Sequence, residues 1–327
     1  MFYRKLSVLL CVVVLSACST NIGDDSSQES SLMKNNNAPA ETPFEFPTLV
    51  PTYTPSPSEL FGYVVIQGYL EDLTPEIFFA DLQSQQIRQL TYGMLATDPK
   101  WSPDGSRIAF VSEKTGDSEI FIMDKDGRNL KRLTSYDGFD AQLSWSPDGN
   151  RIAFVSDREG GLNIHVFDLQ TESIVQLTFG EYSNSDPDWS PDGKQIVFVS
   201  NREPGSGIFT INPDGSNMKK ITKVEFQGYK RPVWGPNNRS IIFEKDSRVG
   251  DSELYIIDLE TLEERPLAIE RVDSSQAISW YASRSPERKY MLFSMFREDR
   301  FLLYVVDMEN NAQYSLGLQG INADLYP

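Results

Sequence analysis

Charged side chains stand a few residues before three of the five tryptophans of this chain. The candidate binding residues in these segments are Asp98, Asp186, Asp188 and Arg231. Carboxylates bind hard cations such as Ca²⁺ and attract basic groups of a partner. The alternative is that these acids accept hydrogen bonds from turn amides or pair with two arginines at neighbouring strand ends, Arg158 and Arg202. A calcium-type cation beside them is compatible with the pattern, but we do not predict one.

Catalytic groups are scarce. The single histidine, His165, stands where equivalent strands of other repeats carry Phe or Tyr, which predicts aromatic-like packing rather than a ligand or base. Gly116-Asp117-Ser118 and Gly250-Asp251-Ser252 resemble the serine motif of one esterase family, but a single histidine cannot activate both serines. The chain has no Gly-x-Ser-x-Gly motif, and its cysteines, Cys11 and Cys18, both lie near the N-terminus. We therefore predict no catalytic residue, no metal site and no cofactor.

A repeat in the sequence indicates which elements position these residues. Trp101, Trp145, Trp189, Trp234 and Trp280 follow one another at intervals of 44, 44, 45 and 46 residues. A period of about 40–45 residues built from short strands is typical of a β-propeller. A helical repeat of similar length would show apolar residues at 3.6-residue spacing, and these units do not.

Each repeat contains four short strands. The strand that ends in Trp101 is followed by Ser102-Pro103-Asp104-Gly105, a tetrad that recurs at residues 146–149 and 190–193. Proline fixes φ at the second position of a tight turn and glycine suits the last, so the tetrad predicts a β-turn. Further strands follow at residues 107–111 and 120–124, and the unit closes on a short strand that ends in Leu-Thr.

The two ends of the chain complete one another. Strands at 63–66, 76–81 and 87–91 have no tryptophan strand before them, whereas Ala323–Tyr326 is a first strand with no successors and places Tyr326 at the tryptophan position. We therefore predict an all-β fold over residues 60–327: a six-bladed propeller of four-stranded antiparallel blades, closed by pairing of the C-terminal strand with the N-terminal blade. The blade after Trp280 has extra residues before its turn proline and is expected to be irregular.

The repeat Trp-Ser-Pro-Asp-Gly, Ile-Ala-Phe, Ile-Phe-Ile-Met-Asp, Asp-Gly and Leu-Thr resembles that of the TolB-type β-propellers. The resemblance implies that the first strand of each blade is innermost, so that Asp98, Asp186, Asp188 and Arg231 lie at the mouth of the axial channel. TolB itself carries an α/β domain before its propeller, and the sequence here predicts a signal and a tether in that place. The resemblance is specific for the fold, and fold alone does not fix function.

The N-terminal segment predicts export. Arg4 and Lys5 precede a short apolar run, and Leu15-Ser16-Ala17-Cys18 resembles a bacterial lipobox. We expect a lipoprotein signal peptide over residues 1–17 and a lipid on Cys18, which would anchor the protein in the membrane on the extracytoplasmic side of the cell envelope. Residues 18–59 are rich in Ser, Thr, Asn and Pro, a composition that predicts a disordered tether.

Composition narrows the function further. The formal net charge of −17 and the pI of about 4.5 argue against nucleic-acid binding, which needs a basic surface. We expect a monomeric, non-catalytic scaffold that binds a protein, peptide or glycan of the envelope or of the extracellular space. The alternative is a hydrolase or lyase that acts on carbohydrate or peptide through carboxylates at the channel mouth.

Overall fold

A computed structural model describes residues 62–70, 72–202, 206–223, 228–235, 238–246, 252–267, 278–284, 290–297, 300–307 and 313–326. The predicted signal peptide, the predicted lipidation site Cys18 and the predicted tether all lie outside these residues. In the described part of the chain, no helix has the length and apolar character needed to cross a membrane.

The described elements are β-strands, and they form six four-stranded antiparallel sheets, the blades of a propeller. The innermost strands of blades 1 to 6 are β24 (Ile321–Tyr326), β4 (Ala96–Trp101), β8 (Asp140–Trp145), β12 (Asn184–Trp189), β16 (Tyr229–Trp234) and β20 (Ile278–Arg284). The second strands are β1 (Tyr63–Tyr69), β5 (Arg107–Ser112), β9 (Arg151–Ser156), β13 (Ile196–Ser200), β17 (Ser240–Asp246) and β21 (Tyr290–Arg297). The third strands are β2 (Pro75–Asp81), β6 (Glu119–Asp124), β10 (Asn163–Asp168), β14 (Gly207–Ile211), β18 (Ser252–Asp258) and β22 (Arg300–Asp307). The outer strands are β3 (Gln86–Gln89), β7 (Lys131–Arg132), β11 (Ile174–Gln176), β15 (Lys219–Lys220), β19 (Glu264–Pro266) and β23 (Gln313–Gln319).

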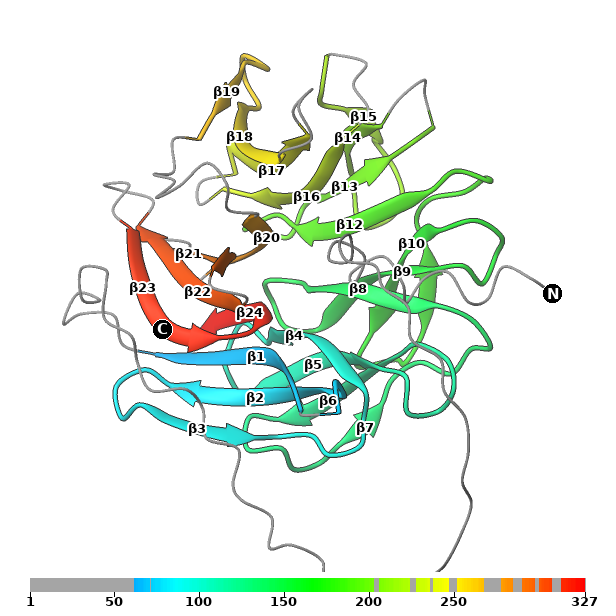
Figure 1. The fold of residues 1–327 in the computed structure, drawn as a ribbon. Helices are drawn as coiled ribbons and strands as arrows, with labels where there is room; N and C mark the ends of the chain where they lie inside the picture. Colours follow the sequence, from blue (N-terminus) through cyan, green and yellow to red (C-terminus); the bar gives the residue numbers. More distant parts are fainter. Residues whose placement is uncertain are drawn as a thin grey trace, which may run out of the picture. The chain divides into compact units, whose positions relative to one another are not determined.

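The six innermost strands surround the middle of the ring (Figure 1), and each contacts the innermost strand of the next blade, including β20 with β24. The apolar core lies between blades. Trp145 of blade 3 packs against residues of β5 and β6 in blade 2, and Trp189 of blade 4 packs in the same way against blade 3. Burial of each large apolar side chain contributes about 1.5–3 kcal/mol to folding, so these contacts hold neighbouring blades together.

The strand connections lie at two ends of the blades. At the turn end, the first strand connects to the second in blades 2 to 6, and the third strand connects to the outer strand in every blade. At the loop end, the second strand connects to the third, and the outer strand connects to the next blade. The predicted tight turns occur at the turn end: the amides of Gly105, Gly149 and Gly193 donate to the carbonyls of the serines three residues earlier, at 2.8–3.0 Å. Gly105 has φ of 65°, and a Cβ there would lie 2.4 Å from the ring of Tyr326, so glycine is required.

Ring closure is confirmed, with a correction of one residue. β24 pairs with β1, and Val64 stands opposite Leu325 just as Ile108 stands opposite Trp101. Leu325, and not Tyr326, therefore occupies the tryptophan position. The expectation failed because it rested on aromatic type, whereas the register follows the cross-strand pairing. The Tyr326 ring lies 5.8 Å from that of Trp101 and fills the space above the turn of blade 2.

Blade 6 is irregular, as expected, and its register corrects a second assignment. Between Ser279 and Ser283 the first strand contains more residues than β21 has opposite it, and Arg284 then pairs with Met291. Met291 is the counterpart of Ile108, so Arg284 holds the register position that Trp101 holds in blade 2. Trp280 falls within the irregular stretch instead.

Candidate functional site at the loop end of the channel

A β-bulge interrupts the innermost strand of each blade. In blade 2, Thr97 pairs with Val111 and Lys100 pairs with Ala109, so two residues of β4 oppose one of β5. The same count occurs in blades 1, 3, 4 and 5. A bulge leaves a residue unpaired and redirects its side chain. Three of the candidate binding residues, Asp98, Asp186 and Arg231, lie in these bulges, whereas Asp188 follows its bulge and pairs with Val197.

The first bulge residue is polar and left-handed in five blades. It lies three residues before the tryptophan position, with φ between 46° and 55°, and is Asn322, Asp98, Gln142, Asp186 or Arg231 in blades 1 to 5. A left-handed backbone costs roughly 1–2 kcal/mol for a residue with a Cβ. Such strain persists only where surrounding contacts hold it, and it is frequent at functional sites.

Hydrogen bonds connect these residues from blade to blade. The amide of Asp186 donates to Oε1 of Gln142 at 3.0 Å, and the amide of Arg231 donates to Oδ2 of Asp186 at 3.4 Å. On the other side of the ring, Oε1 of Gln67 accepts from Nδ2 of Asn322 at 2.7 Å and from the amide of Asp98 at 3.3 Å. The bulge residues therefore form fixed polar positions on the innermost strands.

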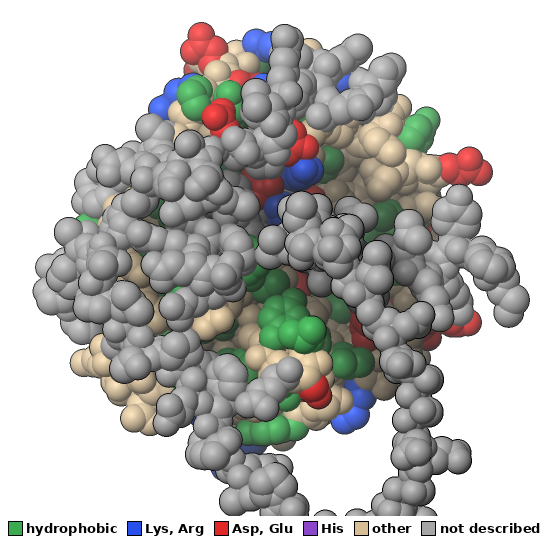
Figure 2. Space-filling view, viewed as in Figure 1, with side chains coloured by type: hydrophobic (Ala, Val, Ile, Leu, Met, Phe, Trp, Pro, Cys, Tyr) green, Lys and Arg blue, Asp and Glu red, His purple; other side chains and the backbone are tan. Residues whose placement is uncertain are grey.

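The charged bulge residues differ from blade to blade in their partners. Asp98 pairs with Lys100 of its own strand at 2.8 Å. Arg231 binds both carboxylate oxygens of Glu244 at 2.7 and 2.8 Å, and Glu244 is buried. Burial raises the pKa of the Asp186 carboxyl, and the Arg231 guanidinium opposes that rise. Burial raises the pKa of Glu244 as well, again opposed by Arg231. Figure 2 shows acidic and basic side chains close together near the middle of the ring.

Asp188 differs from the other three candidates. Its Oδ2 accepts the amide of Trp234 at 2.8 Å, and its Oδ1 accepts the hydroxyl of Ser144 at 3.2 Å. The side chain thus connects the innermost strand of blade 4 to those of blades 5 and 3. Asp324 holds the equivalent position in blade 1 and accepts the amide of Trp101 at 2.5 Å. A contact of this kind stabilises the ring, and the amide that it accepts belongs to an innermost strand and not to a turn.

The arginines named in that alternative have other partners. Arg158 binds Asp140 at 2.7 Å, and Arg202 donates to Oδ1 of Asn184 at 3.1 Å. Sequence reasoning missed Gln142 and Asn322 because it searched for charges. The signal that finds Gln142 is its spacing, three residues before Trp145, whereas Asn322 is found only after Leu325 is recognised at the tryptophan position.

His165 packs as its position predicted. Its ring lies 5.6 Å from that of Phe154, and the equivalent pairs Phe110–Phe121 and Phe198–Phe209 stack at 5.8 and 5.9 Å. Burial lowers the pKa of the imidazole, and a nearby arginine acts in the same direction. With 1% of its surface exposed, this histidine is inaccessible to a substrate.

Only the first of the two serine triplets lies wholly within the described residues, and its serine contacts a carboxylate. Ser118 lies in the loop-end connection of blade 2 and donates to Oε1 of Glu113 at 3.3 Å. Gly250 and Asp251 lie outside the described residues, and Ser252 begins β18. Among the residues that the structure describes, no three His, Cys, Asp or Glu side chains are grouped so that they could hold a metal ion.

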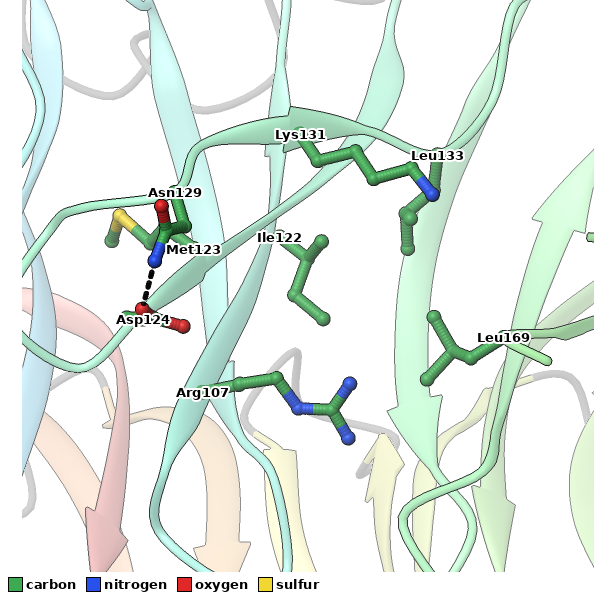
Figure 3. A pocket seen from close by; sticks show the side chains of 8 residues that line it. All are labelled: Arg107, Ile122, Met123, Asp124, Asn129, Lys131, Leu133 and Leu169. Carbon is green, nitrogen blue, oxygen red and sulfur yellow. Dashed lines mark hydrogen bonds between the residues drawn. The ribbon is translucent and has the colours of Figure 1, made fainter.

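A pocket of about 160 Å³ lies away from the channel, between blades 2 and 3. Arg107 and Lys131 line it together with Ile122 and Leu133, and in Figure 3 their side chains converge on its opening. Arg107 donates to the carbonyl of Gly149 at 3.0 Å, and Lys131 pairs with Glu172. Both cations thus already have partners within the chain, which leaves a small and mainly aliphatic hollow.

Comparison with known proteins agrees with this geometry. The family described as the TolB beta propeller domain matches residues 37–280. A relative in Thioalkalivibrio sulfidiphilus (strain HL-EbGR7), named Tol-Pal system protein TolB, is 44% identical over 43 residues, which are 13% of this chain and only 10% of the relative. This chain therefore matches a small part of that relative's length.

Among solved structures, TolB from Acinetobacter baumannii superimposes with a TM-score of 0.67 at 21% identity, over 81% of this chain and 67% of that one. A puromycin-hydrolysing peptidase of Mycobacterium tuberculosis gives a TM-score of 0.56 at 18% identity, over 79% and 44% of the two chains. At such identities the likeness shows the fold alone. Since the family match covers most of the sequence and the six blades agree with it, this chain belongs to the TolB beta propeller domain family.

Proposed function

We propose that this protein is a non-catalytic binding scaffold of the bacterial cell envelope, which holds a protein, peptide or glycan partner at the loop-end mouth of its channel. The observation that carries the proposal is the set of polar bulge residues in left-handed conformation on the innermost strands. Their side chains and amides are fixed by contacts between blades, so the wall is formed before any partner arrives. A preorganised surface loses little conformational entropy on binding.

Asp98, Asp186 and Arg231 supply the recognition in this proposal, and Asp188 holds the strands that carry them. An acid on blade 2 and an acid–base pair at blades 4 and 5 suit a partner that presents both a basic and an acidic or hydroxyl group. Lipid attachment at Cys18 and the tether over residues 18–59 would keep the propeller near the membrane as a monomer and raise its effective concentration there.

Capture of the partner tests the channel mouth. The full chain is used to pull partners from detergent-solubilised envelope, beside the double variant Asp98→Asn/Arg231→Gln and the control variant Asp214→Asn. Asp214 is exposed at the turn end, where it binds Ser216 of its own turn. We expect capture by the wild type and the control, and at least a ten-fold loss in the double variant. Capture that is equal in all three proteins contradicts the proposal.

The anchor is tested separately. Membrane fractionation of cells that express the full chain should place it in the membrane pellet, and Cys18→Ser should release it to the soluble extracytoplasmic fraction. Retention of the Cys18→Ser variant in the pellet would contradict lipid anchoring and leave the channel proposal unaffected.

The second candidate function is a carboxylate-dependent hydrolase or lyase acting on peptide or carbohydrate. One observation favours it: burial raises the pKa of Asp186, and a carboxyl of raised pKa is better suited to general acid–base catalysis than an ordinary one. The similarity in fold to a peptidase is compatible with it. Turnover of a substrate that is abolished in Asp186→Asn, without recovery of any partner, would replace the scaffold by this enzyme.

A further inference from the structure

We propose that the loop end of blades 1 to 4 carries a docking surface for a basic polypeptide, recognised by exposed aromatic rings within a ring of carboxylates. This surface is separate from the channel mouth, because its residues lie in the strand connections and not on the innermost strands. It stands independently of the function proposed above.

Exposed apolar side chains gather at one end of the molecule. Of the eight large hydrophobic residues that are exposed in the described part of the chain, six lie in or beside loop-end connections: Tyr69, Leu73, Tyr92, Leu95, Phe179 and Tyr182. We call these six residues the aromatic patch. Leu73, Tyr92 and Phe179 are 74%, 70% and 65% exposed. Clusters of exposed apolar side chains with a polar rim mark interaction sites.

The connections after β3 and β11 carry four of the patch residues, and each has a hydrogen bond at or near its end to the blade that it leaves. The amide of Met94 donates to the Glu76 carboxylate at 2.9 Å, and the amide of Asn184 donates to the carbonyl of Leu162 at 2.8 Å. Leu73 and Leu95 are held at φ of 64° and 50°, a region that leucine rarely adopts. These side chains are thus presented from fixed backbone, and their exposure does not arise from loose loops.

The charges around the patch define its partner. In the described loop-end connections of blades 1 to 4, the exposed charged side chains are five acids and two lysines, namely Asp72, Glu113, Asp137, Glu159, Glu181, Lys114 and Lys223. Such a rim attracts a cationic chain and repels an acidic one. A second copy of this protein, which carries a formal charge of −17, is therefore a poor occupant.

Two tyrosines of this molecule already form cation–π contacts with arginines. The Arg158 guanidinium lies 5.3 Å from the ring centre of Tyr136, and that of Arg202 lies 5.6 Å from the ring of Tyr182. Both tyrosines stand in loop-end connections. Tyr92 and Phe179 lie in equivalent connections and present similar rings to solvent. An arginine-rich segment can place guanidinium groups on such rings while its charges face the carboxylates.

Binding of a labelled nonaarginine peptide to the full chain, followed by fluorescence anisotropy over a salt series, tests the surface. We expect binding that weakens as salt rises and that is weaker for a nonalysine peptide of equal charge, because arginine stacks better on aromatic rings. The variant Tyr92→Ser/Phe179→Ser should bind about ten-fold more weakly. The matched variant Leu130→Ser/Val175→Ser removes two exposed apolar residues away from the patch and should bind as the wild type does.

A second pair of variants separates the patch from the general acidity of the protein. Glu159→Gln/Glu181→Gln neutralises two patch acids, and Glu260→Gln/Glu263→Gln neutralises two exposed acids at the turn end of blade 5. Only the first pair should weaken binding. Equal weakening by both pairs, or no binding at all, overturns the proposal. A third outcome also overturns it. If a neutral oligosaccharide such as maltohexaose binds independently of salt, and Tyr92→Ser/Phe179→Ser loses this binding while keeping peptide binding, the patch is a glycan site.

Discussion

The two ends of the blades differ in how they use their polar residues. At the turn end, the same contacts recur: Ser102 and Ser146 each donate to the aspartate two residues later, and the turn closes on a glycine. At the loop end, one buried contact also recurs, from the amide near the start of the third strand to a threonine hydroxyl, as in Ile120 to Thr134 and Ile164 to Thr178. The exposed loop-end positions, in contrast, vary from blade to blade and present rings and acids. The repeated chemistry therefore serves the fold, and the variable chemistry is available for recognition.

The largest effect on stability is expected for the tryptophans that are buried between blades. Trp189→Ala removes a ring that is 1% exposed between blades 3 and 4 and should lower the free energy of unfolding by about 3–5 kcal/mol. Phe179→Ala, at the loop end, should change it by less than about 0.5 kcal/mol. Urea denaturation measures both. Similar losses for the two variants would break the distinction between the ends.

A substitution at the ring closure should lower stability by nearly as much. Asp324→Ala removes the acceptor for the amide of Trp101 and leaves that buried group without a partner, which should cost about 1.5–3 kcal/mol of unfolding free energy. Asp324→Asn retains an acceptor oxygen and is the matched control, with a smaller loss. If the two variants unfold at the same urea concentration, the hydrogen bond does not stabilise the closure.

A substitution in one turn at the turn end should lower stability by a moderate amount. Ser146 is buried, donates to Asp148 and accepts the amide of Arg151 at 2.9 Å, so Ser146→Ala should lower stability by about 1 kcal/mol. Ser135, exposed at the loop end, can be replaced by alanine with no measurable change. Thermal unfolding of both variants sharpens the comparison, and a larger loss for Ser135→Ala would reverse it.

The smallest effect concerns pH. Burial holds the pKa of His165 below its ordinary value of about 6.5, so below that pH the unfolded chain binds more protons than the folded one. Stability is then fully present above about pH 6.5 and declines as pH falls toward the lower folded-state pKa. His165→Phe should remove this part of the slope, as measured by urea unfolding between pH 7.5 and 5. An unchanged slope would show that other groups set it.

The sequence predicted the number of blades correctly but not the strand register in blades 1 and 6. Trp101, Trp145, Trp189 and Trp234 all hold the expected position. Tyr326 and Trp280 do not. Tyr326 was assigned by its aromatic ring, although the cross-strand pairing places Leu325 at that position. Trp280 is displaced by extra residues in the first strand of blade 6, which residue type does not show. The partner of Arg231 was missed for a related reason. Glu244 lies on the adjacent strand, and only the cross-strand register brings the two side chains together.

What the sequence determined by itself is local: the turns, the strands and their number. Proline and glycine fix backbone angles, and short runs of apolar residues indicate buried strands, without reference to distant segments. What the tertiary structure decided is which polar side chains meet. The bulges set the direction of Asp98, Asp186 and Arg231, and the packing of each blade on the next gives them neighbours far away in the chain. Such contacts depend on register and closure, which are properties of the assembled ring.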